Sequence, residues 1–333
     1  MSDLYITNRT VPYRTDLCRG LSAAGYKVFR YEEGDIPVRN VAGKAVLRNP
    51  VDLLSREHPS HILVPEFSGM AVQMAMLRKR FGFKVVSFCD DSLDMIQGND
   101  FSLMHRAARR LVPGLLDGII TLSPAVARWY EERFGLKPLW MPIMADECRI
   151  RPELERLLPL SASLRPSRKP VVAFVGRFVG LKNIPALIEA FQPWRDRAQL
   201  VLIGDGPLRP QLEIQAPDAI FPGMVYGDDL LAWYNLIDIL VLPSTQEAYG
   251  AVTGEALMAG AKVIVSRKAG STDLVREGQN GFLVEPTDVA GLTGRIGQLL
   301  DTLPADRPLT LRDNLHPYRF KDCLAELVDG INN

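Results

Sequence analysis

The sequence predicts an α/β protein with two doubly wound domains, each a parallel sheet covered by helices. Length is the first observation behind this prediction, because 333 residues exceed one ordinary core and suit two domains of about 150 residues each. The second is that short β-rich runs alternate with amphipathic helical patterns from end to end. The third is a segment rich in Pro, Ser and Arg at 158–170, which divides the pattern into two series.

The first series, within 1–150, predicts buried parallel strands. Its apolar runs lack strict alternation, which is typical of strands covered on both faces. Amphipathic segments such as 68–82 lie between several of them. The predicted strands are LYIT (4–7), YKVFRY (26–31), HILV (61–64), KVVSFC (84–89) and GIITLS (118–123).

The second series restarts the alternation after a linker expected at 151–170. It predicts another doubly wound domain over 171–315, and ligands of such sheets bind at the carboxyl ends of the strands. Two such domains facing each other would form a cleft. The predicted strands are VVAFVG (171–176), QLVLIG (199–204), AIFPG (219–223), DILVLPS (238–244) and AKVIVS (261–266).

Composition excludes several classes of protein. Lys+Arg and Asp+Glu both total 39, so nothing indicates a nucleic-acid partner. The four cysteines are scattered and the four histidines show no zinc spacing, so no metal site is expected. The N-terminus lacks a signal pattern and no apolar run reaches membrane-spanning length, so we expect a cytoplasmic protein.

A candidate anion site follows the strand VVAFVG. The strand runs into Arg177 and FVGLKN, which places Lys182 and Asn183 ahead of the helical segment IPALIEAF. Asn183 is predicted as the N-cap and Pro185 suits the first turn. Free N–H groups and two cations at a helix N-terminus favour an anion. The alternative is an Arg and a Lys solvated on a loop.

The turn GDGP (204–207) stands at another strand end. It lacks the third glycine of a dinucleotide fingerprint. We expect Gly204 only to let the backbone approach a ligand.

The stretch EAYGAVTGE (247–255) spaces two carboxylates eight positions apart. If all of it were helical, Glu247 and Glu255 would lie roughly 12 Å apart, and closer with a loop between them. That exceeds the roughly 5–9.5 Å of a glycosidase carboxylate pair. It matches the span of a nucleotide sugar, whose vicinal hydroxyls carboxylates accept and whose diphosphate Arg177 and Lys182 would neutralise. Gly250 permits close backbone approach. A solvated helix face is the alternative.

These segments together resemble the donor domain of the family-4 retaining glycosyltransferases. The motifs are GRFVGLKN, GDGP, FPGMVYGDDLLAWYNLIDILVLPS, the E-x7-E element with its following strand, and GSTDLVREGQNGFLVEPTD, which cover about 171–290. That family has the GT-B fold, two facing Rossmann-like domains. The resemblance implies an acceptor-side domain at 1–150 and a donor-binding domain at 171–315. It also implies that the amphipathic tail 316–333 forms a helix packing back on the first domain.

The resemblance also implies roles for individual residues. Arg177 and Lys182 would hold the donor diphosphate, Glu255 the ribose and Glu247 the transferred hexose. Backbone after the third strand would meet the base, and backbone before the E-x7-E helix the phosphate or sugar. The remaining predicted donor-binding residues are Gly204, Met224, Val225, Tyr249, Gly250 and Ala251.

The first domain matches the family less densely, mainly in SPAVARWYEERFG (123–135). Many members carry a Gly-Gly loop after the first strand, where this chain has TNRTVPYR (7–14). Many also carry a His-Asp pair after the fourth strand, where this chain has SFCDDSLD. Asp90 or Asp91 stands in that place and would orient an acceptor hydroxyl or the donor hexose. The alternative is an Asp that caps the next segment.

Two basic segments mix cations with apolar residues: RKRFGFK (78–84) and MHRAARRLVPGLL (104–116). One interpretation is peripheral contact with the inner membrane surface, near a lipid-linked acceptor. Ordinary solvated helix faces are the other.

The predicted function is a retaining transfer of a hexose from a nucleotide diphosphate sugar to a hydroxyl of a glycan or lipid-linked glycan. The sugar nucleotide is a co-substrate and no cofactor is expected. No D-x-D pair occurs, so the charges of Arg177 and Lys182 would replace a metal. Glu247, Asp90 and Asp91 complete the predicted catalytic set. A nucleotide-sugar epimerase of the same fold and a catalytically silent nucleotide-sugar-binding subunit are the alternatives.

Overall fold

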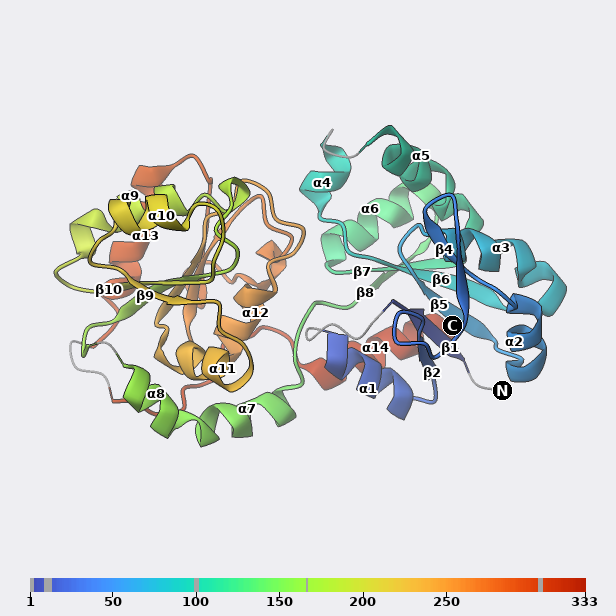
Figure 1. Cartoon of the computed structure of the whole chain (residues 1–333), viewed down its shortest axis with the longest axis horizontal. Helices are drawn as coiled ribbons and strands as arrows, with labels where there is room; N and C mark the ends of the chain where they lie inside the picture. The colour runs from blue at the N-terminus through green and yellow to red at the C-terminus, as the bar shows by residue number, and fades with distance from the viewer. Residues whose placement is uncertain (1–2, 9–13, 99–101, 166, 305–307) are drawn as a thin grey trace. The chain divides into compact units, whose positions relative to one another are not determined.

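The computed structural model describes residues 3–8, 14–98, 102–165, 167–304 and 308–333, and it consists of two compact units (Figure 1). Unit 1 comprises Met1–Ala145 with Phe320–Asn333, and unit 2 comprises Asp146–Arg319. The predicted α/β class is confirmed, because each unit is built on a parallel sheet with helices packed against it.

Unit 1 contains a six-stranded parallel sheet in the order β2-β1-β5-β6-β7-β8. Its central strands are almost wholly buried, as their uninterrupted apolar sequences require. The strands are β1 Leu4–Thr7, β2 Lys27–Arg30, β5 His61–Pro65, β6 Lys84–Cys89, β7 Gly118–Thr121 and β8 Lys137–Trp140. The helices are α1 Thr15–Ala23, α2 Pro50–Glu57, α3 Gly69–Phe81, α4 Leu93–Gln97, α5 Leu103–Leu111, α6 Pro124–Phe134 and α14 Phe320–Asn332, with the 3-10 turn η2 Pro113–Leu115.

The C-terminal helix α14 is part of unit 1, where it packs on α1 and β8 (Figure 1). Two glycines allow these close contacts. A Cβ on Gly20 of α1 would lie 2.5 Å from Leu324 Cδ2 of α14, and a Cβ on Gly330 of α14 would lie 2.6 Å from Leu139 Cδ2 of β8. α3 and α6 cover the other face of the sheet (Figure 1).

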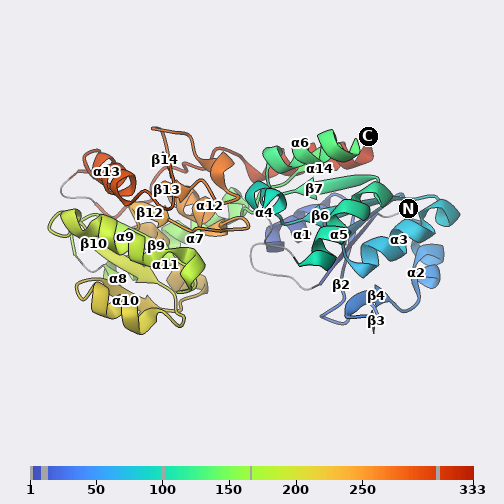
Figure 2. The ribbon, with the colours of Figure 1, turned by 90° about the horizontal axis from the view of Figure 1, so that it is seen from above.

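Unit 1 also contains a hairpin that was not predicted from sequence. β3 Val38–Val41 and β4 Lys44–Leu47 form an antiparallel hairpin, which Figure 2 shows apart from the six-stranded sheet. Its residues are mostly exposed, so the strands lack the apolar runs that mark the others. β4 packs on α3 beside Gly69.

Unit 2 contains a six-stranded parallel sheet in the order β11-β10-β9-β12-β13-β14. Figure 1 shows α9, α10 and α13 on one face and α8 and α11 on the other. The strands are β9 Val171–Val175, β10 Gln199–Ile203, β11 Ile220–Gly223, β12 Ile239–Leu242, β13 Lys262–Ser266 and β14 Gly281–Val284. The helices are α7 Glu147–Arg156, α8 Leu158–Leu164, α9 Ile184–Phe191, α10 Arg209–Gln215, α11 Gly227–Leu236, α12 Ala251–Met258 and α13 Val289–Leu300, with the turns η3 Gly180–Lys182, η4 Gln192–Trp194 and η5 Thr272–Leu274.

The structure differs from the linker expected at 151–170. Most of that segment belongs to α7 and α8, which pack on α11 within unit 2. Asp146 caps α7 by accepting a hydrogen bond from the Cys148 N–H (2.9 Å), and Ile150 and Leu154 form its buried face. Pro159 does not exclude a helix, because it lies in the first turn of α8, where the missing N–H would have no partner within the helix.

The strand order fixes where ligands can bind in each unit. In unit 2 the order reverses between β9 and β12, and in unit 1 between β1 and β5. Connections leave such neighbours in opposite directions, so a crevice opens at their carboxyl ends. None of the helices in the described ranges has the length and apolar character to cross a membrane.

Candidate functional site

The loop after β9 carries the two predicted cations of unit 2. Arg177 lies two residues after the end of β9 and is exposed, and Lys182 is the last residue of η3. Within the described ranges, the Arg177 guanidinium makes no hydrogen bond or ion pair. It is therefore available to an anion.

Asn183 occupies the N-cap position of α9, as predicted, but its side chain makes no capping hydrogen bond. Its φ is +52°, and its carboxamide instead donates to the carbonyls of Pro243 (3.2 Å) and Pro286 (2.8 Å). The left-handed backbone accounts for the difference, because N-cap residues typically have extended backbone. Pro185 lies in the first turn, as predicted. Asn183 thus ties the Lys182 loop to the loops after β12 and β14.

Lys182 and Glu247 come together at the reversal point of the sheet. The Thr245 N–H donates to the Leu181 carbonyl (2.9 Å), which joins the loop after β9 to the loop after β12. The Lys182 ammonium forms an ion pair with the Glu247 carboxylate, and both side chains are largely buried. A cation predicted to hold the diphosphate is therefore neutralised by the carboxylate predicted to hold the hexose.

The segment around Glu247 is held by the loop after β13. The Glu247 N–H donates to the Lys268 carbonyl (3.2 Å), and the Ser271 N–H donates to the Tyr249 carbonyl (2.9 Å). Gly250 has φ +91°, and a Cβ there would lie 2.5 Å from Leu242 Cδ2. The glycine is thus required for the chain to turn into α12, which begins at Ala251.

Glu255 lies in the second turn of α12 and has a partner that the sequence did not reveal. The hydroxyl of Tyr234, a buried residue of α11, donates to Glu255 Oε2. Burial raises the pKa of Glu255, and the hydrogen bond from Tyr234 lowers it in part. The tyrosine fixes the carboxyl group in one orientation. Nothing in the local sequence marks Tyr234, because it looks like any core aromatic residue.

The remaining donor-site candidates lie along the same sheet edge. Gly204 is buried after β10, and a Cβ there would lie 1.9 Å from the Gly176 carbonyl oxygen. It therefore supports the loop that carries Arg177. Met224 is exposed and Val225 half-buried just after β11, farther along the edge.

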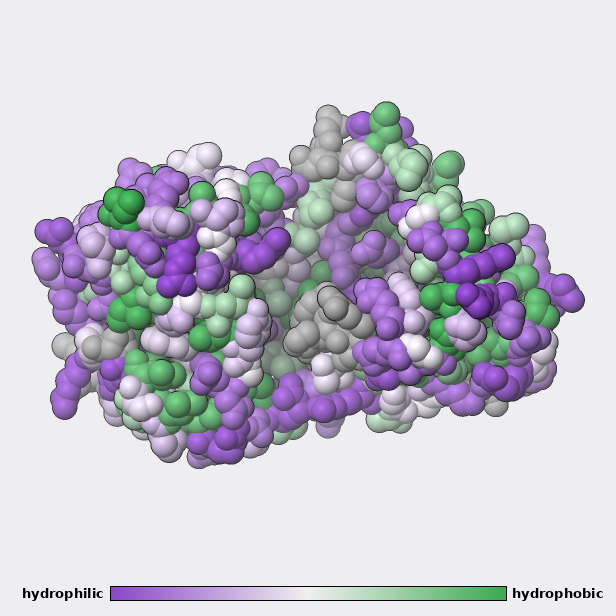
Figure 3. All heavy atoms as spheres, viewed as in Figure 1, coloured by the Kyte–Doolittle hydropathy of each residue, from purple (hydrophilic) through white to green (hydrophobic). Residues whose placement is uncertain are grey.

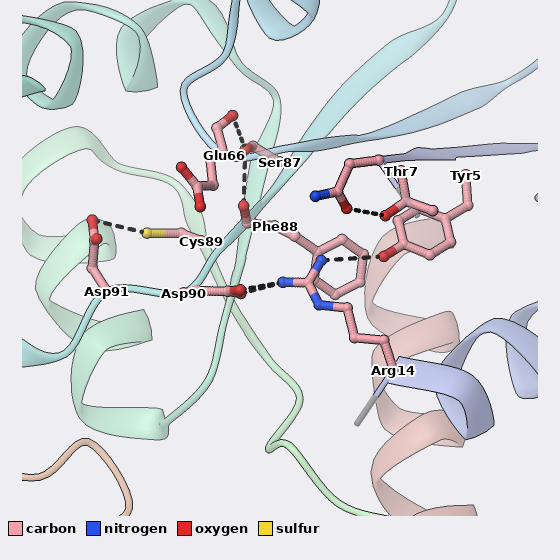
Figure 4. A network of polar contacts seen from close by, with 10 residues as sticks. Tyr5, Thr7, Arg14, Glu66, Ser87, Phe88, Cys89, Asp90 and Asp91 are labelled. Atoms are coloured by element: carbon pink, nitrogen blue, oxygen red, sulfur yellow. Dashed lines mark hydrogen bonds and ion pairs between the residues drawn. The ribbon is translucent and has the colours of Figure 1, made fainter. Parts of the chain in front are cut away.

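Asp90 and Asp91 follow β6 in unit 1, and their side chains point to different partners (Figure 4). Asp90 forms an ion pair with Arg14, whose guanidinium lies over the Phe88 ring (5.6 Å to the centroid). Asp91 is buried and accepts from two nitrogens of Arg109. Both candidate carboxylates are thus neutralised by arginines that the sequence analysis did not single out.

Glu66 is the functional candidate that sequence analysis missed. It directly follows β5, beside the reversal point, and has a left-handed backbone with φ +45°. Non-glycine residues in this conformation cluster at functional sites. Ser87 donates to its carbonyl and its N–H donates to the Phe88 carbonyl (2.6 Å), which holds the backbone there (Figure 4). The sequence feature that could have identified Glu66 is its position directly after the strand HILVP.

The Glu66 side chain is exposed, and its carboxylate makes no hydrogen bond or ion pair in the described part of the chain. Partial desolvation raises the pKa of its carboxyl group, and the charges of Asp90 and Asp91 raise this pKa further. The charges of Arg109 and Arg14 lower it in part. It opens on a cavity of about 130 Å³. The cavity is lined by Lys44, Glu66, Phe67, Ser68, Met104, His105, Ala108 and Arg109.

The loop after β1 is described only in part. Asn8 accepts a hydrogen bond from Thr7 Oγ1 (3.4 Å). Arg9 and Thr10, in the segment that replaces the Gly-Gly loop, lie outside the described residues.

Comparison with solved structures identifies the fold. Anabaena Alr3699/HepE in complex with UDP superposes with a TM-score of 0.75 over 100% of both chains, at 17% identity. Sucrose-phosphate synthase from Thermosynechococcus elongatus gives 0.74 over 99% of this chain and 98% of that one, at 18% identity. The predicted GT-B fold is therefore confirmed.

Sequence comparison relates unit 2 to a family. Residues 169–302 match the family described as Glycosyl transferases group 1. The chain is 35% identical over 172 residues to the GDP-mannose-dependent alpha-mannosyltransferase of Corynebacterium glutamicum. The aligned region covers 51% of this chain and 38% of that protein. The chain thus spans well under half the length of this relative. Fold and site define a GT-B protein whose second unit is similar to group 1 glycosyltransferases.

Proposed function

We propose that the protein is a glycosyltransferase that moves a hexose from a nucleotide diphosphate sugar to a hydroxyl acceptor, in glycan or lipid-linked glycan assembly. The observation that carries the proposal is the ion pair of Lys182 and Glu247 where the strand order of unit 2 reverses, with the exposed Arg177 in the same loop as Lys182. Relatives named for glycosyl transfer and a structural neighbour in complex with UDP support it.

The donor would lie along the carboxyl edge of the unit 2 sheet. Arg177 and Lys182 would bind the diphosphate, with backbone at 249–251 and the start of α12 beside it. Glu255, oriented by Tyr234, would accept from the ribose hydroxyls. The base would contact backbone at Met224 and Val225. Gly204 would act by supporting the Arg177 loop.

The reaction places negative charge on the leaving diphosphate and positive charge on the sugar ring. Arg177 and Lys182 would stabilise the first charge without a metal ion, as preorganised donors do in an oxyanion hole. Glu247 would release Lys182 to the diphosphate and hold the hexose hydroxyls. Retention at the anomeric carbon is proposed from the resemblance to family-4 enzymes.

The acceptor would bind to unit 1, at the carboxyl ends of β5 and β6. Glu66 would orient its hydroxyl, because that carboxylate is exposed while Asp90 and Asp91 are paired with arginines. Asp90 and Asp91 would then act by positioning Arg14 and Arg109. A lipid-linked acceptor would bring the protein to the inner membrane surface.

The test starts from the donor, because its base and sugar are open. Thermal shift with UDP-, GDP- and ADP-sugars identifies the nucleotide that binds to the purified protein. Incubation with that donor should then release nucleoside diphosphate slowly by hydrolysis, with or without EDTA. Proton NMR of the first sugar formed should show the anomer of the donor. Binding without any release indicates a silent nucleotide-sugar-binding subunit, and an inverted anomer or loss of activity in EDTA contradicts the assignment.

A further inference from the structure

We propose that the outer face of α5, together with the following turn η2, docks on the surface of an anionic phospholipid membrane. α5 has no buried residue, which is unusual for a helix with five apolar side chains in nine positions. Its Leu103, Met104 and Leu111 are 78%, 70% and 70% exposed, and Leu115 of η2 is 44% exposed. Figure 3 shows hydrophobic and strongly hydrophilic atoms side by side over this helix, at the top of the right-hand unit.

Helical geometry separates α5 into two faces. At about 100° per residue, Leu103, Ala107 and Leu111 lie along one side. Arg106 and Arg110 lie along one edge of that side. The opposite side carries His105, Ala108 and Arg109, which line the cavity of about 130 Å³, with Arg109 bonded to Asp91. The helix therefore turns a charged side chain toward the protein and its leucines toward solvent.

Charge identifies the occupant of this outer face. Residues 103–116 contain no acidic residue, and two of their three arginines, Arg106 and Arg110, lie beside the outer leucines. An apolar stripe flanked by cations is the pattern of a helix that lies in the interface plane of a membrane. Anionic lipids attract such a segment, and each Lys or Arg near the surface strengthens membrane binding about fivefold. A protein partner would need an apolar groove with an acidic rim to fit this face equally well, whereas an anionic membrane offers both properties over its whole surface.

The same helix connects this surface to the candidate acceptor site. Met104 is 70% exposed beside the leucines and also lines the wall of the cavity on which Glu66 opens. Docking through α5 would hold that cavity at the lipid headgroups, where a lipid-linked acceptor presents its hydroxyls. This last step rests on the proposed function, whereas membrane docking itself does not.

Vesicle co-sedimentation of the full chain tests the proposal. We expect the protein to bind vesicles of phosphatidylglycerol and phosphatidylcholine in equal parts, to bind pure phosphatidylcholine far less, and to lose much of its binding in high salt. The double variant Leu103→Ser, Leu111→Ser should reduce the partition coefficient about tenfold or more, and Arg110→Ser about fivefold. Ile214→Ser is the matched control: Ile214 is 81% exposed on α10 of unit 2, and its loss should change nothing.

Three results would overturn the proposal. The first is absence of binding to the anionic vesicles, and the second is an equal loss of binding in Ile214→Ser. The third is a self-association of the chain that the leucine variants abolish while vesicle binding stays unchanged, since a second copy would then cover α5. Thermal melting and nucleotide binding of every variant are measured alongside. Those data keep a folding defect, and any failure of the glycosyltransferase assignment, distinct from failure of membrane docking.

Discussion

Lys182 and Glu247 form an ion pair across the loops that follow β9 and β12, at the point where the strand order of unit 2 reverses. The pair holds a largely buried cation in the loop that also carries Arg177. A diphosphate that binds there must compete with Glu247 for the ammonium group. The pair thus links the donor phosphate to the residue proposed for the hexose.

Lys182→Ala should weaken nucleoside-diphosphate binding by about 1.5–3 kcal/mol, because a charge-assisted contact is lost. Isothermal titration at low and moderate salt measures the effect. Lys169→Ala is the control, since Lys169 precedes β9 at the opposite edge of the sheet. Equal affinities for Lys182→Ala and the unaltered protein would remove Lys182 from the site.

Glu247→Ala should depress turnover by on the order of a hundredfold while nucleoside-diphosphate affinity stays equal or rises. Turnover falls because the hexose loses its positioning group, and affinity is kept because Lys182 no longer has an internal competitor. Steady-state kinetics and titration separate the two effects. A loss of affinity as large as the loss of turnover would assign Glu247 to the nucleotide instead.

Glu66→Gln should lower transfer to the acceptor by at least about tenfold and leave nucleotide binding in unit 2 unchanged. The amide keeps the size of the side chain but is a poorer acceptor for a hydroxyl proton. Glu132→Gln, on the exposed side of α6, is the matched control in unit 1. Full activity in Glu66→Gln would leave the cavity without a role in acceptor binding.

Asp273 should make the stability of unit 2 depend on pH. Both of its carboxylate oxygens are buried without a hydrogen bond in the described ranges, and burial raises its pKa from 3.8 to about 7. Between about pH 4 and pH 7 the folded state therefore binds more protons than the unfolded state, so stability falls as pH rises. The loss is complete above pH 7 and amounts to at most about 4 kcal/mol.

Asp273→Asn cannot ionise and should escape this loss. Its Tm should exceed that of the unaltered protein at pH 8, and the two should converge toward pH 4. Asp196→Asn, an exposed change in the same unit, should follow the unaltered protein at every pH. A constant difference between Asp273→Asn and the unaltered protein across this range would show that Asp273 does not titrate as inferred.

Most of the sheet could be predicted from sequence because its strands are continuous apolar runs. β1 and β6 begin and end where LYIT and KVVSFC do. β8 and the hairpin β3–β4 were missed because KPLW and the half-exposed hairpin strands carry no such run. The composition of 158–170, rich in Pro, Ser and Arg, predicts a linker, whereas α7 and α8 are helices that pack on α11.

The site was less predictable, because its pairs join distant parts of the chain. Local sequence indicated Asp90 but not its partner Arg14, which stands 76 positions away. It indicated Glu255 but not Tyr234. Lys182 and Glu247 were both identified as donor-site residues, yet only the fold reveals that they bind each other.

The position of α14 has a consequence for biosynthesis. A ribosome delivers the strands and helices of unit 2 before this last helix, although α14 completes unit 1 by covering α1 and β8. During translation of unit 2, nascent unit 1 therefore lacks α14, and the apolar surfaces of α1 and β8 that α14 covers stay exposed. The nascent chain is most prone to aggregation during this interval, and we expect chaperone binding to matter most then. It also means that no single proteolytic cut separates the two units intact.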